Sequence, residues 1–145
     1  MNTVEDDIRA MVDRETQAWD ARDASSLAAL FHPDMVWPWP RHARAHDPAE
    51  WVMFLGRFHR ERWIAVWQAL FDSATLLRND RRIAKIILSK EGDGALAVVD
   101  IDTLWQMRDG TKDHWKGRVG KVYAKLSTGE WKITMHTGVL DYRGL

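Results

Sequence analysis

The feature that most constrains the fold is residues 95–142, which read as three long strands in succession. Turn-forming residues at 91–94, 109–110 and 127–130 divide this part of the chain, and each turn lies between runs of β-branched and aromatic residues. That pattern is typical of antiparallel hairpins. The sequence therefore predicts four antiparallel strands joined by three hairpin connections.

The register of the middle hairpin decides which side chains face each other, because a shift of one residue turns every side chain to the opposite face. A two-residue loop at 109–110 would place apolar residues opposite charged ones. A three-residue loop at 108–110, with Gly110 in the left-handed conformation, pairs opposite charges instead. The pairs are Asp100 with Arg118 and Asp102 with Lys116. We favour this register, since it matches like with like.

Extending the register through the last hairpin, with Leu126 opposite Trp131, Ala124 opposite Ile133 and Val122 opposite Met135, assigns the side chains to two faces. One face is expected to be a core that opens into a polar pocket; it carries Val122, Ala124, Leu126, Trp131, Ile133, Met135, Asp100, Asp102, Lys116, Arg118 and Thr137. The convex face then carries Val99, Ile101, Trp105, Trp115, Val119 and Tyr123 among Lys121, Lys125, Lys132 and His136. Because a sheet that is apolar on both sides must be covered twice, we expect helices on the first face and a homodimer partner on the convex face.

Size and composition exclude several classes of protein. At 145 residues the chain is long enough for one domain and too short for two ordinary ones, so residues 1–145 are expected to form a single domain. Lys plus Arg and Asp plus Glu both number 21, which gives no electrostatic argument for nucleic acid or an anionic membrane. The chain has no Cys, an acidic start and no apolar run close to the roughly 20 residues of a membrane span. We therefore expect a cytoplasmic protein.

Nine Trp residues are several times what an ordinary composition gives. They can be explained as a core of large flat side chains. Alternatively, some of them line a cavity for an apolar or aromatic ligand, because indole rings are rigid and lose little entropy on binding. Both explanations can hold for different Trp residues. The residues that we assign to ligand binding are Trp19, Trp37, Trp39, Trp63, Met135 and Thr137.

The N-terminal residues predict an amphipathic helix. Thr3 can cap it, acidic residues in the first turn suit the positive end of the helix dipole, and apolar residues recur at helical spacing as far as Trp19. Glu15 is the one charge on this apolar stripe. Because a carboxylate that faces a core is unfavourable unless it is paired or borders a cavity, Glu15 lies either at the edge of the stripe or in a pocket as an acid.

The middle of the chain is expected to contain a short helix at 27–31 and an extended segment at 35–40, where two prolines oppose helix formation. A long helix at 48–71, opened by Asp47 and Pro48, would cover the sheet. Further strands are expected at 74–78 and 82–90.

Histidines in this part of the chain leave one hypothesis open. His59, in the expected long helix, is either a half-exposed histidine or a pocket acid or base. His42 and His46 lie in a loop between two prolines with no third ligand evident nearby. We therefore expect no metal site.

This order of elements resembles the nuclear transport factor 2-like superfamily, whose fold is a cone formed by a curved sheet wrapped around a long helix. The matching motifs are residues 18–23, AWDARD, followed by Leu27, Leu30, Phe31, Pro33 and Asp34, and residues 129–133, GEWKI. Within the superfamily the chain looks most like the SnoaL-like group, which includes polyketide cyclases. The resemblance implies an α+β fold with two further N-terminal helices, a homodimer through the convex sheet face, and a pocket between sheet and helices.

Catalytic residues of better-known members of the superfamily do not carry over. Ketosteroid isomerases use a tyrosine, a base and a protonated aspartate. By ungapped comparison these positions hold Glu15, Trp37 or Pro38, and Val122. Steroid isomerisation by that mechanism is therefore not expected.

The first functional hypothesis is a cofactor-free acid/base enzyme, such as a cyclase, isomerase, dehydratase or hydrolase, that acts on a small apolar or aromatic molecule. Asp100 or Asp102 would be the base, with its pKa raised by burial and by the neighbouring carboxylate, and Arg118 would hold the second carboxylate ionised. Glu15 or His59 would be the partner acid. Limonene epoxide hydrolases use a similar set of two aspartates and an arginine, in a different arrangement.

Two alternatives remain open at this point. Asp100, Asp102, Arg118 and Lys116 can instead form a ladder of cross-strand ion pairs without a catalytic role. The whole protein can also be a non-catalytic ligand-binding or association domain. Whether the two aspartates face a cavity discriminates between these possibilities.

Overall fold

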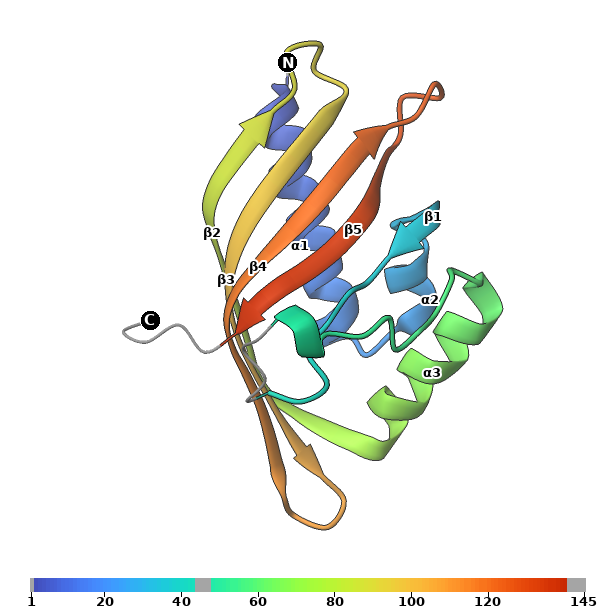
Figure 1. The fold of residues 1–145 in the computed structure, drawn as a ribbon, viewed down its shortest axis with the longest axis vertical. Coiled ribbons are helices and arrows are strands. Elements are labelled where there is room, and N and C mark those ends of the chain that lie inside the picture. The colour runs from blue at the N-terminus through green and yellow to red at the C-terminus, as the bar shows by residue number, and fades with distance from the viewer. Residues whose placement is uncertain (1, 44–47, 141–145) are drawn as a thin grey trace.

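The computed structural model describes residues 2–43 and 48–140 and has the expected α+β architecture (Figure 1). The helices are α1 (Val4–Asp20), α2 (Ala24–Ala28), the short 3-10 helix η1 (Pro48–Glu50) and α3 (Arg60–Ser73). The strands are β1 (Phe31–Val36), β2 (Ala74–Leu88), β3 (Gly94–Met107), β4 (Lys112–Lys125) and β5 (Trp131–Leu140). His46, Asp47 and residues 141–142, which carried expectations above, lie outside the described residues.

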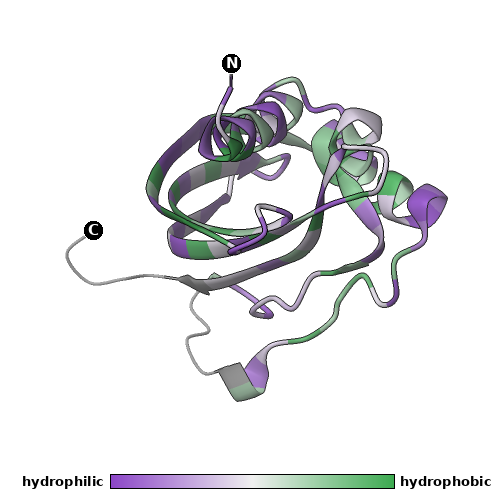
Figure 2. Ribbon diagram, turned by 90° about the horizontal axis from the view of Figure 1, so that it is seen from above, coloured by the Kyte–Doolittle hydropathy of each residue, from purple (hydrophilic) through white to green (hydrophobic). Residues whose placement is uncertain are grey.

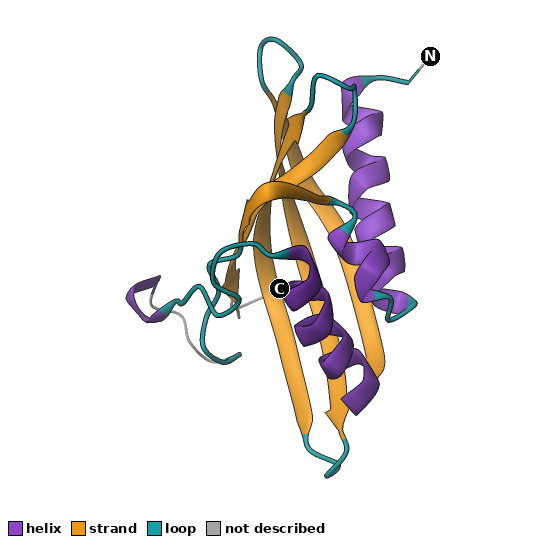
Figure 3. Cartoon of the chain, turned by 90° about the vertical axis from the view of Figure 1, so that its right-hand side faces the viewer, coloured by secondary structure: helices purple, strands orange, loops and turns teal. Residues whose placement is uncertain are grey.

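The strands form one sheet in the order β1-β5-β4-β3-β2. The pairs β2 with β3, β3 with β4, and β4 with β5 are antiparallel, which confirms the three hairpins, and β1 adds to β5 in parallel. The strands expected at 74–78 and 82–90 are one continuous strand, β2, with two register irregularities. The sheet curves around α1, α2 and α3, which lie on its concave side (Figures 2 and 3).

The predicted register of the β3–β4 hairpin is confirmed. Gly110 has a φ of +86°, which places it in the left-handed region, where a residue without Cβ is favoured. Asp100 pairs with Arg118 and Asp102 with Lys116. The turn chemistry therefore fixes which residues of β3 and β4 are neighbours.

The predicted faces of the sheet are wrong, because β5 contains a bulge. Tyr123 pairs with Ile133, whereas Val122 pairs with Met135, so Thr134 is an extra residue on β5. Ile133 is fully buried on the concave side, and the extra residue places Met135 on the opposite face. Ile133 and Met135 therefore point to opposite faces, although strict alternation would place them on the same face.

The concave face carries the residues that were expected outside, and it forms the core with the helices. Its buried members on β3, β4 and β5 include Val99, Ile101, Trp105, Val119, Tyr123, Lys121 and His136. The convex face carries Asp100, Asp102, Lys116, Arg118, Val122, Met135 and Thr137, all partly exposed. The apolar surface assigned to the dimer therefore points inward, and the homodimer itself stays a prediction.

Helix α1 begins as predicted. Thr3 accepts a hydrogen bond from the backbone of Asp6, and the Asp6 side chain accepts one from the backbone of Thr3, which forms a capping box. The stripe of apolar residues is buried against the sheet, and Glu15 is buried with it. Glu15 therefore lies inside the molecule, away from the edge of the stripe.

The other helices differ from the prediction. Helix α3 begins at Arg60 rather than near residue 48, because Gly56 has a φ of +64° and residues 51–59 fold back on α3 as a loop. The indole of Trp63 donates to the carbonyl of Leu55, and this contact fixes the loop. Helix α2 spans Ala24–Ala28 with Asp23 as its cap, so Phe31 starts a strand instead of ending a helix. None of the helices in the described chain is long and apolar enough to cross a membrane.

Candidate functional site

A cavity of about 430 Å³ lies between the concave face of the sheet and the helices. Six tryptophans line it: Trp19, Trp37, Trp39, Trp67, Trp105 and Trp115. The polar and charged residues of the lining are Arg41, Arg81, Thr103, Asp113 and His136. The cavity is therefore largely aromatic, with a small number of polar groups.

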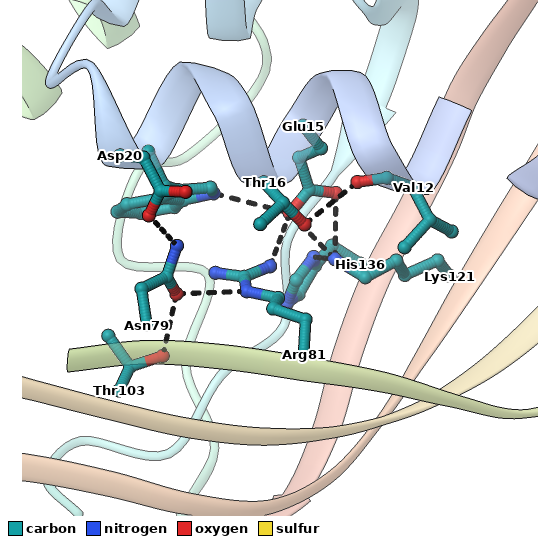
Figure 4. Close-up of polar contacts among 10 residues, drawn as sticks. Val12, Glu15, Thr16, Asp20, Asn79, Arg81, Thr103, Lys121 and His136 are labelled. Atoms are coloured by element: carbon teal, nitrogen blue, oxygen red, sulfur yellow. Dashed lines mark hydrogen bonds and ion pairs between the residues drawn. The ribbon is translucent and has the colours of Figure 1, made fainter. Parts of the chain in front are cut away.

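A network of charged side chains lies directly behind this wall (Figure 4). Lys121 on β4 is fully buried and donates to both carboxylate oxygens of Glu15, at 2.7 and 2.6 Å. Arg81 on β2 donates to Glu15 Oε2 at 2.8 Å, and the indole nitrogen of Trp19 lies 3.2 Å from the same oxygen. Glu15 is thus held by three donors that come from one helix and two strands.

Arg81 connects this network to a second set of polar residues. Its Nε donates to the side-chain oxygen of Asn79 at 3.1 Å, and the hydroxyl of Thr103 donates to the same oxygen at 3.2 Å. The Asn79 amide in turn donates to Asp20 at 2.9 Å. The guanidinium also lies over the ring of Trp19, 5.6 Å from its centroid, so its plane is fixed on several sides.

His136 on β5 also belongs to the network, and its side chain lines the cavity. Its ring stacks on Trp37 with the centroids 3.8 Å apart and the planes 5° from parallel. Its Nδ1 lies 3.4 Å from the ammonium of Lys121. An ammonium has only donors, so Nδ1 must accept, and the proton of the neutral ring is on Nε2.

Burial and mutual attraction set the ionisation of this network. Burial alone raises the pKa of Glu15, but the charges of Lys121 and Arg81 outweigh it and hold the pKa well below its ordinary value. Burial lowers the pKa of Lys121 to about 8, against the attraction of Glu15. Burial, with Lys121 adjacent, lowers the pKa of His136 well below its ordinary value. At neutral pH the network therefore holds one carboxylate, an ammonium, a guanidinium and a neutral imidazole.

Four of the residues assigned above to a site lie at this cavity or directly behind it. Trp19, Trp37 and Trp39 line the cavity, and Glu15 lies in the layer behind them. Trp63 does not line it; its ring packs in the core against Phe31.

His59 is not a pocket residue. It is the N-cap of α3, where its Nδ1 accepts a hydrogen bond from the backbone of Arg62. Met135 and Thr137 lie on the convex face, away from the cavity; the side chain of Thr137 is next to the outward side of Gly120. These three residues are therefore not brought together with the tryptophans.

The expected base and its partner lie outside the tryptophan-lined cavity, because Asp100 and Asp102 border a second, shallower pocket on the convex face. Asp100 accepts from Arg118 at 2.7 Å and from Arg82 at 2.8 Å on the convex face, and the hydrogen bond from Arg118 lowers its pKa. Asp102 accepts from His114 and Arg78; burial raises its pKa, but these contacts lower it overall. Asp100 thus forms the predicted ion pair with Arg118, whereas Asp102 pairs with Arg78 and His114 instead of Lys116. The pKa values of both carboxylates move opposite to the direction expected for a base.

Three functional candidates were missed: Arg81, Lys121 and His136. Lys121 and Glu15 each stand alone as a charge on an otherwise apolar face, one on a strand and one on a helix. Two isolated opposite charges on faces that both require burial are a signal for pairing, because each would be unfavourable alone. Among the described residues no cluster of metal-ligand type occurs, and His42 is exposed.

Comparison with known proteins shows the fold. The sequence matches no protein-family model and no curated protein. The structure is similar to a conserved protein from Planctomyces limnophilus, with a TM-score of 0.71 and 16% identity over 92% of this chain and 93% of that one. It is also similar to a nuclear transport factor 2-like protein from Cytophaga hutchinsonii, with a TM-score of 0.69 and 20% identity over 97% and 100%.

A third similar structure is a ketosteroid isomerase-like protein from Erwinia carotovora, with a TM-score of 0.66 and 15% identity over 90% of each chain. The chain therefore has the nuclear transport factor 2-like fold, as the sequence motifs predict. At these identities the likeness concerns the fold alone. The narrower assignment to the SnoaL-like group stays a prediction.

Proposed function

We propose that this protein binds a small, mostly aromatic molecule in the tryptophan-lined cavity. The observation that carries the proposal is the lining itself, six indole rings and a few polar groups around about 430 Å³. Cavities of this size and composition are typical of small-molecule sites, in which apolar walls supply affinity and few polar groups set orientation. A core built only for stability would be packed without such a space.

The walls are preorganised for a flat ligand. The ring of Trp37 is stacked on His136, and Trp19 packs edge-on against Trp67 with the centroids 5.0 Å apart. Rings held in this way lose little conformational entropy when a ligand arrives. Aromatic ligands are therefore favoured over flexible aliphatic ones of similar area.

Titration calorimetry with two flat probes, 2-naphthamide and 2-naphthoate, tests the proposal. Binding of either probe at a stoichiometry of one per chain is the expected result. Leu70→Trp should abolish it, because Leu70 lines the cavity and a larger side chain fills the space. Val66→Trp is the matched control, one turn earlier on α3 and 43% exposed outside the cavity. If neither probe binds, or if both variants lose binding equally, the cavity is not the site.

A second candidate function is acid/base chemistry without a cofactor, and it is favoured by one observation. Asp113 is the one carboxylate among the described residues that line the cavity; its Oδ2 accepts from the indole of Trp115 at 2.9 Å. A carboxylate in that place can take a proton from a bound molecule.

Hydrogen exchange at the acidic carbon of 2-tetralone, followed by NMR in D₂O, tests this second function. The protein should accelerate the exchange, and Asp113→Asn should remove the acceleration without removing binding. Asp80→Asn, at an exposed aspartate of β2, is the control. No acceleration by the wild-type protein leaves the non-catalytic binding domain as the function.

A further inference from the structure

The charges around the cavity do not balance. Behind its wall are two buried cations, Lys121 and Arg81, and one buried carboxylate, Glu15, whereas Arg41 in the lining is exposed and Asp113 is only partly buried. Asp20 is a further carboxylate nearby, but it is exposed and is held by Asn79. One positive charge therefore remains at a site where burial makes an uncompensated charge unfavourable.

Arg81 directs part of this charge at the cavity. Its side chain is only 7% exposed and lines the cavity. Its Nη1 donates to Glu15 and its Nε to Asn79, whereas its Nη2 makes no hydrogen bond within the described chain. A guanidinium has five N–H donors in a fixed fork, so the donors that remain are held in a fixed direction by those already bonded.

His136 supplies a second donor to the same cavity. Its Nδ1 is occupied by the ammonium of Lys121, so the proton is on Nε2, which has no partner within the described chain. The inner end of the cavity is therefore rich in donors.

The acceptor Asp113 lies at a different level of the sheet. Arg81 pairs with Ile101 of β3, whereas Asp113 pairs with Trp105, four residues further along the same strand. At about 3.3 Å per residue these rungs are about 13 Å apart along the strand. An anionic group near Arg81 is thus separated from the carboxylate of Asp113.

We infer that the ligand of this cavity is an aromatic molecule that carries a carboxylate group, bound with the carboxylate on Arg81 Nη2 and His136 Nε2. This inference rests on the proposed function and names its ligand class. Two N–H donors from different strands match the two oxygens of one carboxylate, and the anion neutralises the remaining charge. Figure 4 shows the two side chains beside the same carboxylate, Glu15, which holds the guanidinium directly and reaches the imidazole through Lys121.

Calorimetric comparison of 2-naphthoate with 2-naphthamide on the wild-type protein tests the inference without any substitution. The two probes have the same ring system and nearly the same shape, and they differ in charge. We expect 2-naphthoate to bind at least about tenfold more tightly, since hydrogen bonds to a charged group contribute more than neutral ones. Equal binding, or tighter binding of the amide, overturns the carboxylate assignment and leaves the proposed binding function intact.

Two matched variants place the effect at Arg81. Arg81→Gln should reduce the preference for 2-naphthoate to about twofold or less, while 2-naphthamide still binds. The small preference that remains comes from the hydrogen bond of the neutral imidazole. Arg82→Gln removes the same charge from the next residue, which is 75% exposed on the convex face, and should keep the tenfold preference. A preference lost equally in both variants would show an effect of net charge and overturn the inference. Absence of binding by both probes overturns the proposed function as well.

Discussion

The two faces of the sheet both carry ion pairs, and they place them in opposite environments. On β4, Lys121 points inward and is fully buried on Glu15, whereas Arg118, three residues earlier, points outward and is 39% exposed on Asp100. If one partner of the inner pair is removed, solvent does not reach the charge that remains, because both side chains are fully buried. Solvent reaches the outer pair, because Arg118 is partly exposed. The N–O distance is 2.6 Å in the inner pair and 2.7 Å in the outer pair. The distance alone therefore does not tell which ion pair contributes more to stability, whereas burial does.

The largest expected difference comes from removing one inner cation. Lys121→Met should lower the free energy of unfolding by about 3–5 kcal/mol, because it leaves Glu15 buried with Arg81 as its remaining ionic partner. Lys116→Met, on the same strand but on the convex face, should change it by less than about 1 kcal/mol. Urea unfolding followed by Trp fluorescence measures both values.

A double variant distinguishes the loss of the pair from the loss of packing. Glu15→Gln together with Lys121→Met removes both charges, so it should be less destabilising than the sum of the two single changes. Additive effects would show that the two side chains act independently, and the contrast between the faces would then be one of burial alone.

The sequence predicted the elements of the sheet well, because turn residues and alternation are local signals. The hairpin at Gly110 set the register of β3 on β4 correctly, and the capping box of α1 was visible from Thr3. The predicted assignment of the β3 and β4 side chains to the two faces was wrong, and the reason is also local. One extra residue at Thr134 reverses the alternation along β5, and nothing in the pattern of β5 marks the bulge.

The site was harder to predict than the fold, because it depends on which face is inside. One face of the sheet carries more large apolar residues, such as Trp105 and Tyr123, than the other. Because the face that packs in the core is the more apolar one, this difference indicates which face points inward. With that orientation, Lys121 meets Glu15. The loop before α3 could not be foreseen from periodicity, because its aromatic residues, such as Phe54 and Phe58, recur at near-helical spacing and pack against Trp67 and Trp63 although they are not in a helix.

The second prediction compares a glycine on each face. Gly138→Ala on β5 should destabilise the protein by about 1–3 kcal/mol, because the new Cβ would lie 2.7 Å from Trp39 Cζ3 and displace an indole of the cavity wall. Gly120→Ala on β4 meets nothing closer than 3.7 Å and should have a much smaller effect. Thermal unfolding measures the difference, and probe binding reports whether the moved indole narrows the cavity. Equal shifts in Tm would contradict the close packing of Trp39.

The third prediction concerns pH. Burial lowers the pKa of His136 in the folded state below its unfolded value, so the unfolded chain binds more protons below about pH 6.5. Stability from this group is therefore complete above about pH 6.5 and is lost as the pH falls, by up to about 1.4 kcal/mol per pH unit. Lys121, with a pKa of about 8, and Glu15, whose pKa is held low, change charge outside the window from pH 6.5 to 5.

His136→Gln should flatten the dependence of the unfolding free energy on pH across that window. His114→Gln is the matched replacement on the convex face, where the imidazole is 44% exposed and contacts Asp102 at 2.6 Å. Urea unfolding at several pH values measures the two slopes. An equal flattening in both variants would mean that the pH dependence does not come from the buried histidine.

The smallest effect is expected on the convex face, and salt separates it from the inner one. Asp100→Asn should destabilise by about 1 kcal/mol at low ionic strength, and the effect should shrink in 1 M NaCl, because Arg82 and Arg118 are exposed enough for ions to screen them. The destabilisation by Lys121→Met should change little over the same range, since no ion reaches a fully buried pair. If salt weakens both effects alike, the inner network is open to solvent. The hydrogen bonds from Arg81 to Glu15 and Asn79 would then not hold its guanidinium in a fixed direction toward the cavity.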